Sequence, residues 1–141
     1  MLDTNMLFRG RVLDDARQRG FRMRISTIVY AERLAQVRRR YADLKDAILQ
    51  VENLLKGWDI AVVPFPETDG HAFAEIAQGF EEDVWKSTEE RRHRHDRLIA
   101  ACAVSRQIPL VTDNVQDFEA VRGLHLIEGD EFKRDVERMP A

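Results

Sequence analysis

The sequence predicts an α/β fold in which a mainly parallel central sheet is flanked by helices. Short apolar runs typical of strands alternate along the chain with longer segments that have helical periodicity. The clearest strand is the continuous apolar run IAVVPF at residues 60–65, whose β-branched composition predicts burial on both faces. Sheets of this kind gather functional side chains where the carboxyl ends of their strands meet.

The N-terminal part of the chain predicts a strand, a helix and a second strand. The residues MLDT end a short apolar strand, and the helix at 6–19 stops at Gly20. The segment RMRIST at 22–27 is the next strand, and either Ser26 or Thr27 caps the helix that follows it.

A long apolar stripe occupies the next helical region. Apolar residues recur at alternating spacings of four and three from Tyr30 to Leu55. This pattern predicts either one long helix or a pair of helices broken near Tyr41. The stripe either covers the domain core or forms a dimer or partner surface, because it is long enough to extend past a small sheet.

The second half of the chain continues the alternation of helices and strands. Pro66, followed by Thr68 and Asp69, opens a helix that runs to about Phe80, and a polar, basic segment follows at 81–95. The remaining predicted elements are a helix that begins at Asp96, strands at 108–112 and 124–128, and between them a turn with a short helical piece at 113–121.

The composition is that of a globular domain. The 141 residues are 44% hydrophobic and 33% charged, which predicts one folded domain spanning residues 1–141 rather than a disordered chain. No apolar run approaches the roughly 20 residues of a membrane helix, and the first residues do not resemble a signal peptide. Cys102 is the single cysteine and lies within the apolar run LIAACAV, so we expect a buried thiol in a reducing, cytoplasmic environment.

The net charge of −3 hides a strong asymmetry. Residues 1–40 hold ten arginines against four acids, a net charge of +6, so the remaining residues carry −9. A second basic cluster surrounds Asp96 and consists of Arg91, Arg92, His93, Arg94, His95 and Arg97. Basic residues beside an acidic site suit a polyanionic substrate, and Arg91, Arg92 and Arg94 are its predicted contacts. The alternative is a solvated helix face balanced by Glu89 and Glu90.

Four acidic residues stand out along the chain: Asp3, Glu32, Asp96 and Asp117. Three of them sit where a strand should end or a helix should begin, which places them at one edge of a sheet. Two carboxylates about 4 Å apart repel by roughly 4 kcal/mol at an effective dielectric of about 20. A chain that gathers them usually binds a hard cation such as Mg²⁺ or Mn²⁺. Taken one at a time, each acid could instead be a helix cap, a turn residue or a partner of a helix dipole.

Four motifs in this order carry a family resemblance: LDTN, STIVYAERL, DRLIAACA and LVTDNVQDF. They span nearly the whole chain, which resembles the PIN-domain family and most closely the VapC-type ribonuclease toxins of prokaryotic toxin–antitoxin pairs. The resemblance implies a compact three-layer α/β sandwich and hydrolysis of RNA phosphodiester bonds with Mg²⁺ or Mn²⁺. It also implies a VapB-type antitoxin as partner, and together with the apolar stripe it predicts a homodimer.

The resemblance implies roles for residues at matching positions. Asp3 and Asp96 match the principal metal ligands of the family, and Glu32 matches the second acidic position, which holds the metal or orients its water. Thr4 and Asn5 match the residues that follow the first aspartate and position it. Only two residues precede Asp3, so the first strand is either very short or continues upstream.

The loop after the strand at 108–112 holds the fourth acidic position. Thr112 matches the threonine that shapes this loop, and the family usually has Asp or Asn two residues later, which is Asn114 here. We take Asp117 as the fourth acid, with Asn114 as a neutral ligand or a substrate contact. Asp113 remains an alternative for the fourth position.

Two other functions and a zinc site are alternatives that parts of the sequence raise. A PIN-like domain without catalysis would be an RNA- or protein-binding module, and the intact acids argue against it. A phosphatase of the haloacid dehalogenase type also starts from an aspartate after a strand, but it needs a second aspartate where this chain has Asn5. His93 and His95 stand close to Asp96 and could act as an acid or a metal ligand, but no cysteine or further histidine nearby completes a zinc set.

Overall fold

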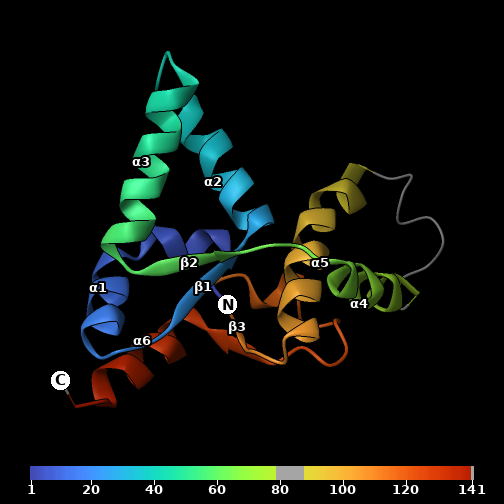
Figure 1. The fold of residues 1–141 in the computed structure, drawn as a ribbon. Helices are drawn as coiled ribbons and strands as arrows, with labels where there is room; N and C mark the ends of the chain where they lie inside the picture. The colour runs from blue at the N-terminus through green and yellow to red at the C-terminus, as the bar shows by residue number, and fades with distance from the viewer. Residues whose placement is uncertain (79–87, 141) are drawn as a thin grey trace.

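The computed structural model describes residues 1–78 and 88–140, where short parallel strands alternate with helices (Figure 1). The strands are β1 (Met23–Ser26), β2 (Ile60–Val63), β3 (Leu110–Thr112) and β4 (Leu126–Glu128). The α-helices are α1 (Gly10–Gln18), α2 (Thr27–Arg38), α3 (Leu44–Gly57), α4 (Glu67–Gln78), α5 (Thr88–Ser105) and α6 (Gly129–Arg138). Short 3₁₀ helices are η1 (Thr4–Phe8) and η3 (Val115–Asp117).

The N-terminal segment joins two pairs of parallel strands. β1 pairs with β2, and β3 pairs with β4. Between these pairs, Leu2 forms a parallel bridge to Val111, and its N–H donates to the carbonyl of Arg24 at 2.7 Å. The order is therefore β2, β1, N-terminal segment, β3, β4, and the predicted first strand is reduced to this bridge. Chain connections change direction beside this segment, so Asp3 leaves the sheet at its topological switch point.

Helices flank this sheet, which confirms the predicted α/β fold. α1 packs on α6, while α5 packs on α4 and α2 (Figure 1). α2 and α3 form an antiparallel hairpin rather than one long helix. α2 ends at Arg38, and Asp43 caps α3 by accepting a 2.9 Å hydrogen bond from the Lys45 N–H. The apolar stripe therefore runs along a pair of helices, which was one of the two predicted alternatives.

Local sequence signals account for the ends of the first helices. Gly20 follows α1 with a φ of +78°, a conformation that glycine adopts without strain, and it stops this helix as predicted. Ser26 caps α2, because its hydroxyl accepts a 3.2 Å hydrogen bond from the Val29 N–H. The helix predicted at 6–19 is divided at Arg9 into η1 and α1.

The strand β2 is not buried on both faces, so this prediction was wrong. Ile60 is buried, but Ala61 is exposed and Val62 is 40% exposed. Among the described strands, β2 pairs only with β1 and lies at the edge of the sheet. α2 and α3 pack against it but cover only part of its surface. A continuous apolar run therefore does not distinguish an edge strand from a central one.

The prediction that a helix begins at Asp96 was also wrong, because α5 begins at Thr88. The residues before Asp96 include glutamates and arginines, which favour helix almost as strongly as alanine does. They lack the apolar period that marks a packed face, and this is why the sequence did not predict their helix. Asp96 lies inside α5 and is not its cap. The polar segment predicted at 81–95 falls partly outside the described residues.

The core is one cluster of buried apolar side chains that the strands and α5 share. It includes Ile25, Val29, Ile99 and Leu110, none of which has exposed surface. Cys102 is equally buried, and this burial raises the pKa of its thiol to about 12, so the expected buried cysteine is confirmed. Within the described residues, no helix is both long enough and apolar enough to span a membrane.

Candidate functional site

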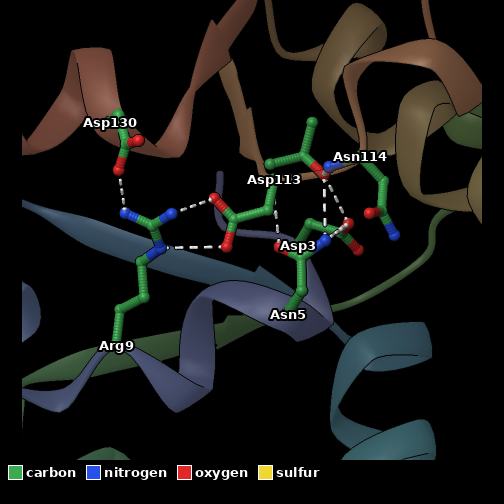
Figure 2. A network of polar contacts seen from close by, with 7 residues as sticks. Asp3, Asn5, Arg9, Asp113, Asn114 and Asp130 are labelled. Atoms are coloured by element: carbon green, nitrogen blue, oxygen red, sulfur yellow. Dashed lines mark hydrogen bonds and ion pairs between the residues drawn. The ribbon is translucent and has the colours of Figure 1, made fainter.

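Asp3 lies at the point where the N-terminal segment leaves the sheet, and it is only 5% exposed. Its Oδ1 accepts a hydrogen bond from the Thr4 N–H at 2.7 Å. Its Oδ2 accepts from Asn5 Nδ2 at 2.9 Å and from Thr112 Oγ1 at 2.7 Å (Figure 2). Burial raises the pKa of Asp3 although these hydrogen bonds favour its ionised form, and nearby acidic charges add to the rise. The orientation of this carboxylate is therefore fixed by three donors.

The loop after β3 is tied to the same point. Asn5 uses both ends of its amide: Nδ2 donates to Thr112 Oγ1 at 3.1 Å, and Oδ1 accepts from the Asp113 N–H at 3.2 Å (Figure 2). The Asn114 N–H donates to Thr112 Oγ1 at 3.0 Å. Thr112 has no exposed surface, so it acts behind the site and connects Asp3 to the loop. Asn5 and Thr112 therefore contact both Asp3 and the loop, and the positioning roles that the resemblance implied for them stay predictions.

Glu32 reaches the site from α2 and is held from two directions. The Thr4 hydroxyl donates to Glu32 Oε2, and His95 Nδ1 lies 2.8 Å from Glu32 Oε1. Thr4 thus connects this carboxylate to Asp3, because its N–H and its hydroxyl contact one acid each. Glu32 retains about a quarter of its side-chain exposure, so it is accessible from the solvent side.

Asp96 reaches the site from α5, where His93 and Asp117 lie beside it. His93 Nδ1 is 3.4 Å from Asp96 Oδ2 and 4.0 Å from Asp117 Oδ1. One ligand atom from each of these three residues lies within 4.8 Å of the other two, a spacing that could hold a metal ion. Burial raises the pKa of Asp96 to about 6, and the charges of Asp3 and Asp117 contribute, while His93 opposes the rise.

Asp113 points away from these carboxylates. Its two oxygens lie 2.9 Å from Arg9 Nε and 2.7 Å from a terminal nitrogen of the same guanidinium. Arg9 also contacts Asp130 at 2.6 Å, so it connects the start of α1 to α6 (Figure 2). Gly129 leaves room for this pair, since a Cβ there would collide with Asp113 Oδ1. Asp117, and not Asp113, therefore shares the site with Asp96.

Asp3, Glu32 and Asp96 line a cleft of about 620 Å³ between η1, α2 and α5, whereas Asp117 and Thr112 lie outside its lining. Its polar lining consists of Asp3, Thr4, Asn5, Glu32, Gln36, Arg39, His95, Asp96 and Asn114. Its apolar lining consists of Phe8, Ile28, Ala31, Ala35 and Leu98. A cleft with one acidic corner and one apolar wall can accept a ligand that carries both charge and a flat apolar group.

Of the arginines predicted to contact substrate, Arg94 is not part of this lining. Arg94 is partly exposed and lies on α5. Arg91 and Arg92 belong to the same helix, but their side chains lie outside the described residues. The donor set itself fits a divalent cation, because carboxylate oxygens with a neighbouring imidazole suit Mg²⁺ or Mn²⁺. Burial, and to a smaller extent the neighbouring acidic charges, raise the pKa of Asp3 and Asp96.

Comparison with known families identifies the family to which this chain belongs. The chain matches the PIN domain over residues 1–124, a span that includes every candidate residue. The chain belongs to the PIN-domain family. No curated protein matches it significantly in sequence.

Solved structures with the same fold agree with this assignment. VapBC2 from Rickettsia felis bound to a DNA fragment from its promoter matches with a TM-score of 0.68 and 20% identity, over 91% of this chain and 96% of that chain. DNA-bound VapBC from Salmonella typhimurium matches with a TM-score of 0.71 and 21% identity, over 92% and 96%. VapBC-1 from nontypeable Haemophilus influenzae matches with a TM-score of 0.71 and 21% identity, over 92% of this chain and 97% of that chain. At these identities the likeness establishes a shared PIN fold.

One buried charge pair of this PIN domain was not predicted. Asp69 has no exposed surface, and a nitrogen of Arg106 lies 2.7 and 2.6 Å from its two oxygens. A second Arg106 nitrogen donates to the Pro64 carbonyl at 2.7 Å. Although burial opposes ionisation, hydrogen bonds from Arg106 and Ser105 hold the pKa of Asp69 below its usual value. The pair connects α5, which carries Asp96, to the end of β2 and to α4. In the sequence, Asp69 could not be distinguished from a residue that opens a helix.

Proposed function

We propose that this PIN domain is a divalent-metal-dependent endoribonuclease that hydrolyses RNA phosphodiester bonds. The observation that carries the proposal is the cleft in which the fixed carboxylate of Asp3 meets Asp96 and Glu32, with Asp117 beside Asp96. Burial and the neighbouring acidic charges both raise the pKa of Asp3 and Asp96, and a cation between these carboxylates would relieve both effects. The alternative, a catalytically silent RNA- or protein-binding module, does not explain why these acids are gathered in one cleft.

In the proposed reaction, Asp3 and Asp96 hold Mg²⁺ or Mn²⁺, while Glu32 and Asp117 hold metal or orient and deprotonate the attacking water. A divalent cation, when bound, lowers the pKa of a coordinated water and neutralises charge on the phosphate. Asp3 can offer a ligand oxygen in a fixed direction because three donors hold its carboxylate. Thr4 and His95 hold Glu32 in the same way.

Substrate contacts follow from the lining of the cleft. Thr4, Asn5 and Asn114 carry hydrogen-bonding groups beside the acids and are proposed to contact RNA. Thr112 is fully buried, so we assign it a positioning role through Asp3 and Asn114. Arg94 is proposed to attract the RNA backbone, together with Arg91 and Arg92 of the same helix.

We further propose that the protein is the toxin of a type II toxin–antitoxin pair, a cytoplasmic homodimer neutralised by a VapB-type antitoxin. The solved structures with the same fold are VapBC complexes, which supports this class of partner. Leu44 and Leu49 on α3 are 49% and 54% exposed, so the helical hairpin offers apolar surface for another chain. An antitoxin segment that places an Arg or Lys among the acids would displace the metal.

Cleavage of single-stranded and structured RNA under single-turnover conditions tests the enzymatic proposal. We expect hydrolysis with Mg²⁺ or Mn²⁺, no hydrolysis in EDTA, and loss of hydrolysis in Asp3→Asn. Asp46→Asn is a matched control, since Asp46 is an exposed acid on α3 that does not line the cleft. RNA binding without hydrolysis under every metal condition would favour the silent binding module instead.

A further inference from the structure

A basic pocket lies beside the acidic cleft, and the proposed reaction makes no use of it. The pocket has a volume of about 260 Å³ and is lined by Phe8, Arg33, Gln36, Val37, Arg39 and Arg40. Three of these six residues are arginines, and none is acidic. The three arginines belong to α2 and the residues just after it, within the N-terminal part of the chain that carries the excess positive charge.

Arg33 occupies this pocket in a way that leaves it short of partners. Its guanidinium lies 4.5 Å from the centre of the Phe8 ring, and one terminal nitrogen lies 3.3 Å from Gln36 Oε1. Its Nε is buried and has no hydrogen-bond partner within the described structure. A buried donor and two neighbouring like charges are conditions that a bound anion relieves.

Other arginines of this part of the chain already have internal acceptors. Arg9 binds Asp113 and Asp130, and Arg38 donates to the Tyr41 carbonyl. By contrast, in the part of the chain that the structure describes, neither Arg33 nor Arg40 forms an ion pair with a carboxylate. Their charges are therefore available to a ligand.

The basic pocket is continuous with the acidic cleft. Phe8, Gln36 and Arg39 line both. Phe8 belongs to η1, the short helix that Asp3 caps, so this helix connects the basic pocket to the acidic corner. It is 62% exposed, although a phenylalanine of this size is usually buried. An exposed aromatic ring next to arginines is the arrangement that binds single-stranded nucleic acid by base stacking and phosphate contact.

We propose that this pocket binds a backbone phosphate of the RNA substrate next to the scissile bond, with Arg33 and Arg40 contacting the phosphate and Phe8 contacting an unpaired base. The inference rests on the proposed function, because it assumes that RNA occupies the acidic cleft. It adds a path for the bound RNA: the RNA strand runs from the acids along η1 to the end of α2. It also predicts a preference for single-stranded RNA, whose bases are free to stack on Phe8.

Binding of a labelled single-stranded RNA of about ten nucleotides tests the pocket, measured by fluorescence anisotropy at several salt concentrations in EDTA. The Asp3→Asn background prevents cleavage. We expect Arg33→Gln and Arg40→Gln each to weaken binding by roughly three- to tenfold and to reduce the slope of log affinity against log salt by about 0.7. Phe8→Ala should weaken binding and leave this slope unchanged. Arg38→Gln, an exposed arginine of the same helix, is the control and should change neither quantity.

The outcomes separate this inference from the proposed function. Unchanged RNA binding in Arg33→Gln, Arg40→Gln and Phe8→Ala would overturn the pocket, even in an active nuclease. A parent protein that never hydrolyses RNA would overturn the nuclease, whereas loss of binding in these variants would still support the pocket. Titration with inorganic phosphate distinguishes the source of the anion: phosphate alone binding as tightly as RNA would mean a free-anion site. If the variants lost binding to an acidic protein partner but not to RNA, the occupant would be protein, and the proposal would be wrong.

Discussion

Asp3 and Asp96 line the same cleft, but the structure holds them in different ways. Asp3 leaves the sheet between β1 and β3, is almost fully buried and accepts three hydrogen bonds. Asp96 stands on a helix, keeps about a quarter of its side-chain exposure and lies 3.4 Å from His93, which also faces Asp117. The hydrogen bonds of the fold thus fix the position of Asp3. Asp96 is surrounded by charged side chains, and a bound cation would change the repulsion among them.

This difference implies different responses to perturbation. The Asp3 half should tolerate changes in pH and metal because hydrogen bonds from the backbone and side chains hold it. The Asp96 half depends on the placement of α5, to which the buried pair of Asp69 and Arg106 contributes, and on whatever cation neutralises the acids. Experiments that disturb one half and not the other can therefore test the comparison directly.

The largest effect should come from breaking the anchor of α5. Arg106→Gln leaves Asp69 buried without its partner, and removing one member of a buried pair costs about 3–5 kcal/mol. We expect this loss of unfolding free energy in urea denaturation. Arg138→Gln, which removes an exposed pair on α6, is the control and should change stability little. If Arg106→Gln were as stable as the parent, Asp69 would have to be satisfied in another way and α5 would not depend on this pair.

The next effect concerns the rate of the proposed reaction. Asp3→Asn and Asp96→Asn should each lower the single-turnover rate of RNA cleavage by about a hundredfold or more, which is about 2.7 kcal/mol in the barrier. Asp3→Asn should change the melting temperature little, because its one amide oxygen can still accept from the Thr4 N–H, and the acceptor lost to Asn5 and Thr112 is offset by removing a carboxylate whose charge burial and neighbouring acids oppose. Cleavage by Asp3→Asn at the parent rate would show that the reaction does not use this site.

The sequence predicted the sheet-edge half of the site better than the helical half. Asp3 follows an apolar strand-like run, and the strand positions determine where its carboxylate lies, so a short motif was informative. The relation of His93 to Asp96 depends on α5 extending back to Thr88, and polar residues carry no periodic signal for such an extension.

Two further features were beyond sequence reasoning for a similar physical reason. Asp113 and Asp117 lie in one loop and look alike in the sequence, but of these two it is Asp113 that Arg9, more than a hundred residues away, binds. Asp69 resembles a residue that opens a helix until Arg106 packs beside it. In both cases a distant arginine decides the role of an acid, and local pattern contains no information about that contact.

The third prediction concerns metal. If the acids share one cation, Mn²⁺ or Mg²⁺ at about 100 times its dissociation constant should stabilise the fold by about 2.7 kcal/mol. For a domain of this size the melting temperature should rise by roughly 5–10 °C. The double variant Asp3→Asn, Asp96→Asn should lose most of this rise. An equal response in the double variant would place the bound metal elsewhere.

The fourth prediction concerns pH in the absence of metal. Folding raises the pKa of Asp96 from 3.8 to about 6, so the folded state binds more protons than the unfolded state between these values. This contribution to stability is present at low pH and is lost as the pH rises towards 6 and above. We expect Asp96→Asn to gain roughly 1–2 kcal/mol relative to the parent between pH 4 and 7. Urea denaturation of both proteins at several pH values measures the difference, and parallel pH profiles would contradict it.

The smallest effects should separate the two aspartates of the loop after β3. Asp117 lies beside Asp96 and His93, so Asp117→Asn should lower the cleavage rate by about tenfold or more and leave stability nearly unchanged. Asp113 pairs with Arg9 through both of its oxygens, with about 30% of the side chain exposed, so Asp113→Asn should cost about 1 kcal/mol of stability and little activity. Cleavage rates and urea denaturation of the two variants, measured side by side, decide the matter. The reverse result, with activity lost in Asp113→Asn and stability lost in Asp117→Asn, would mean that the loop turns during catalysis and that Asp113 is the fourth acid.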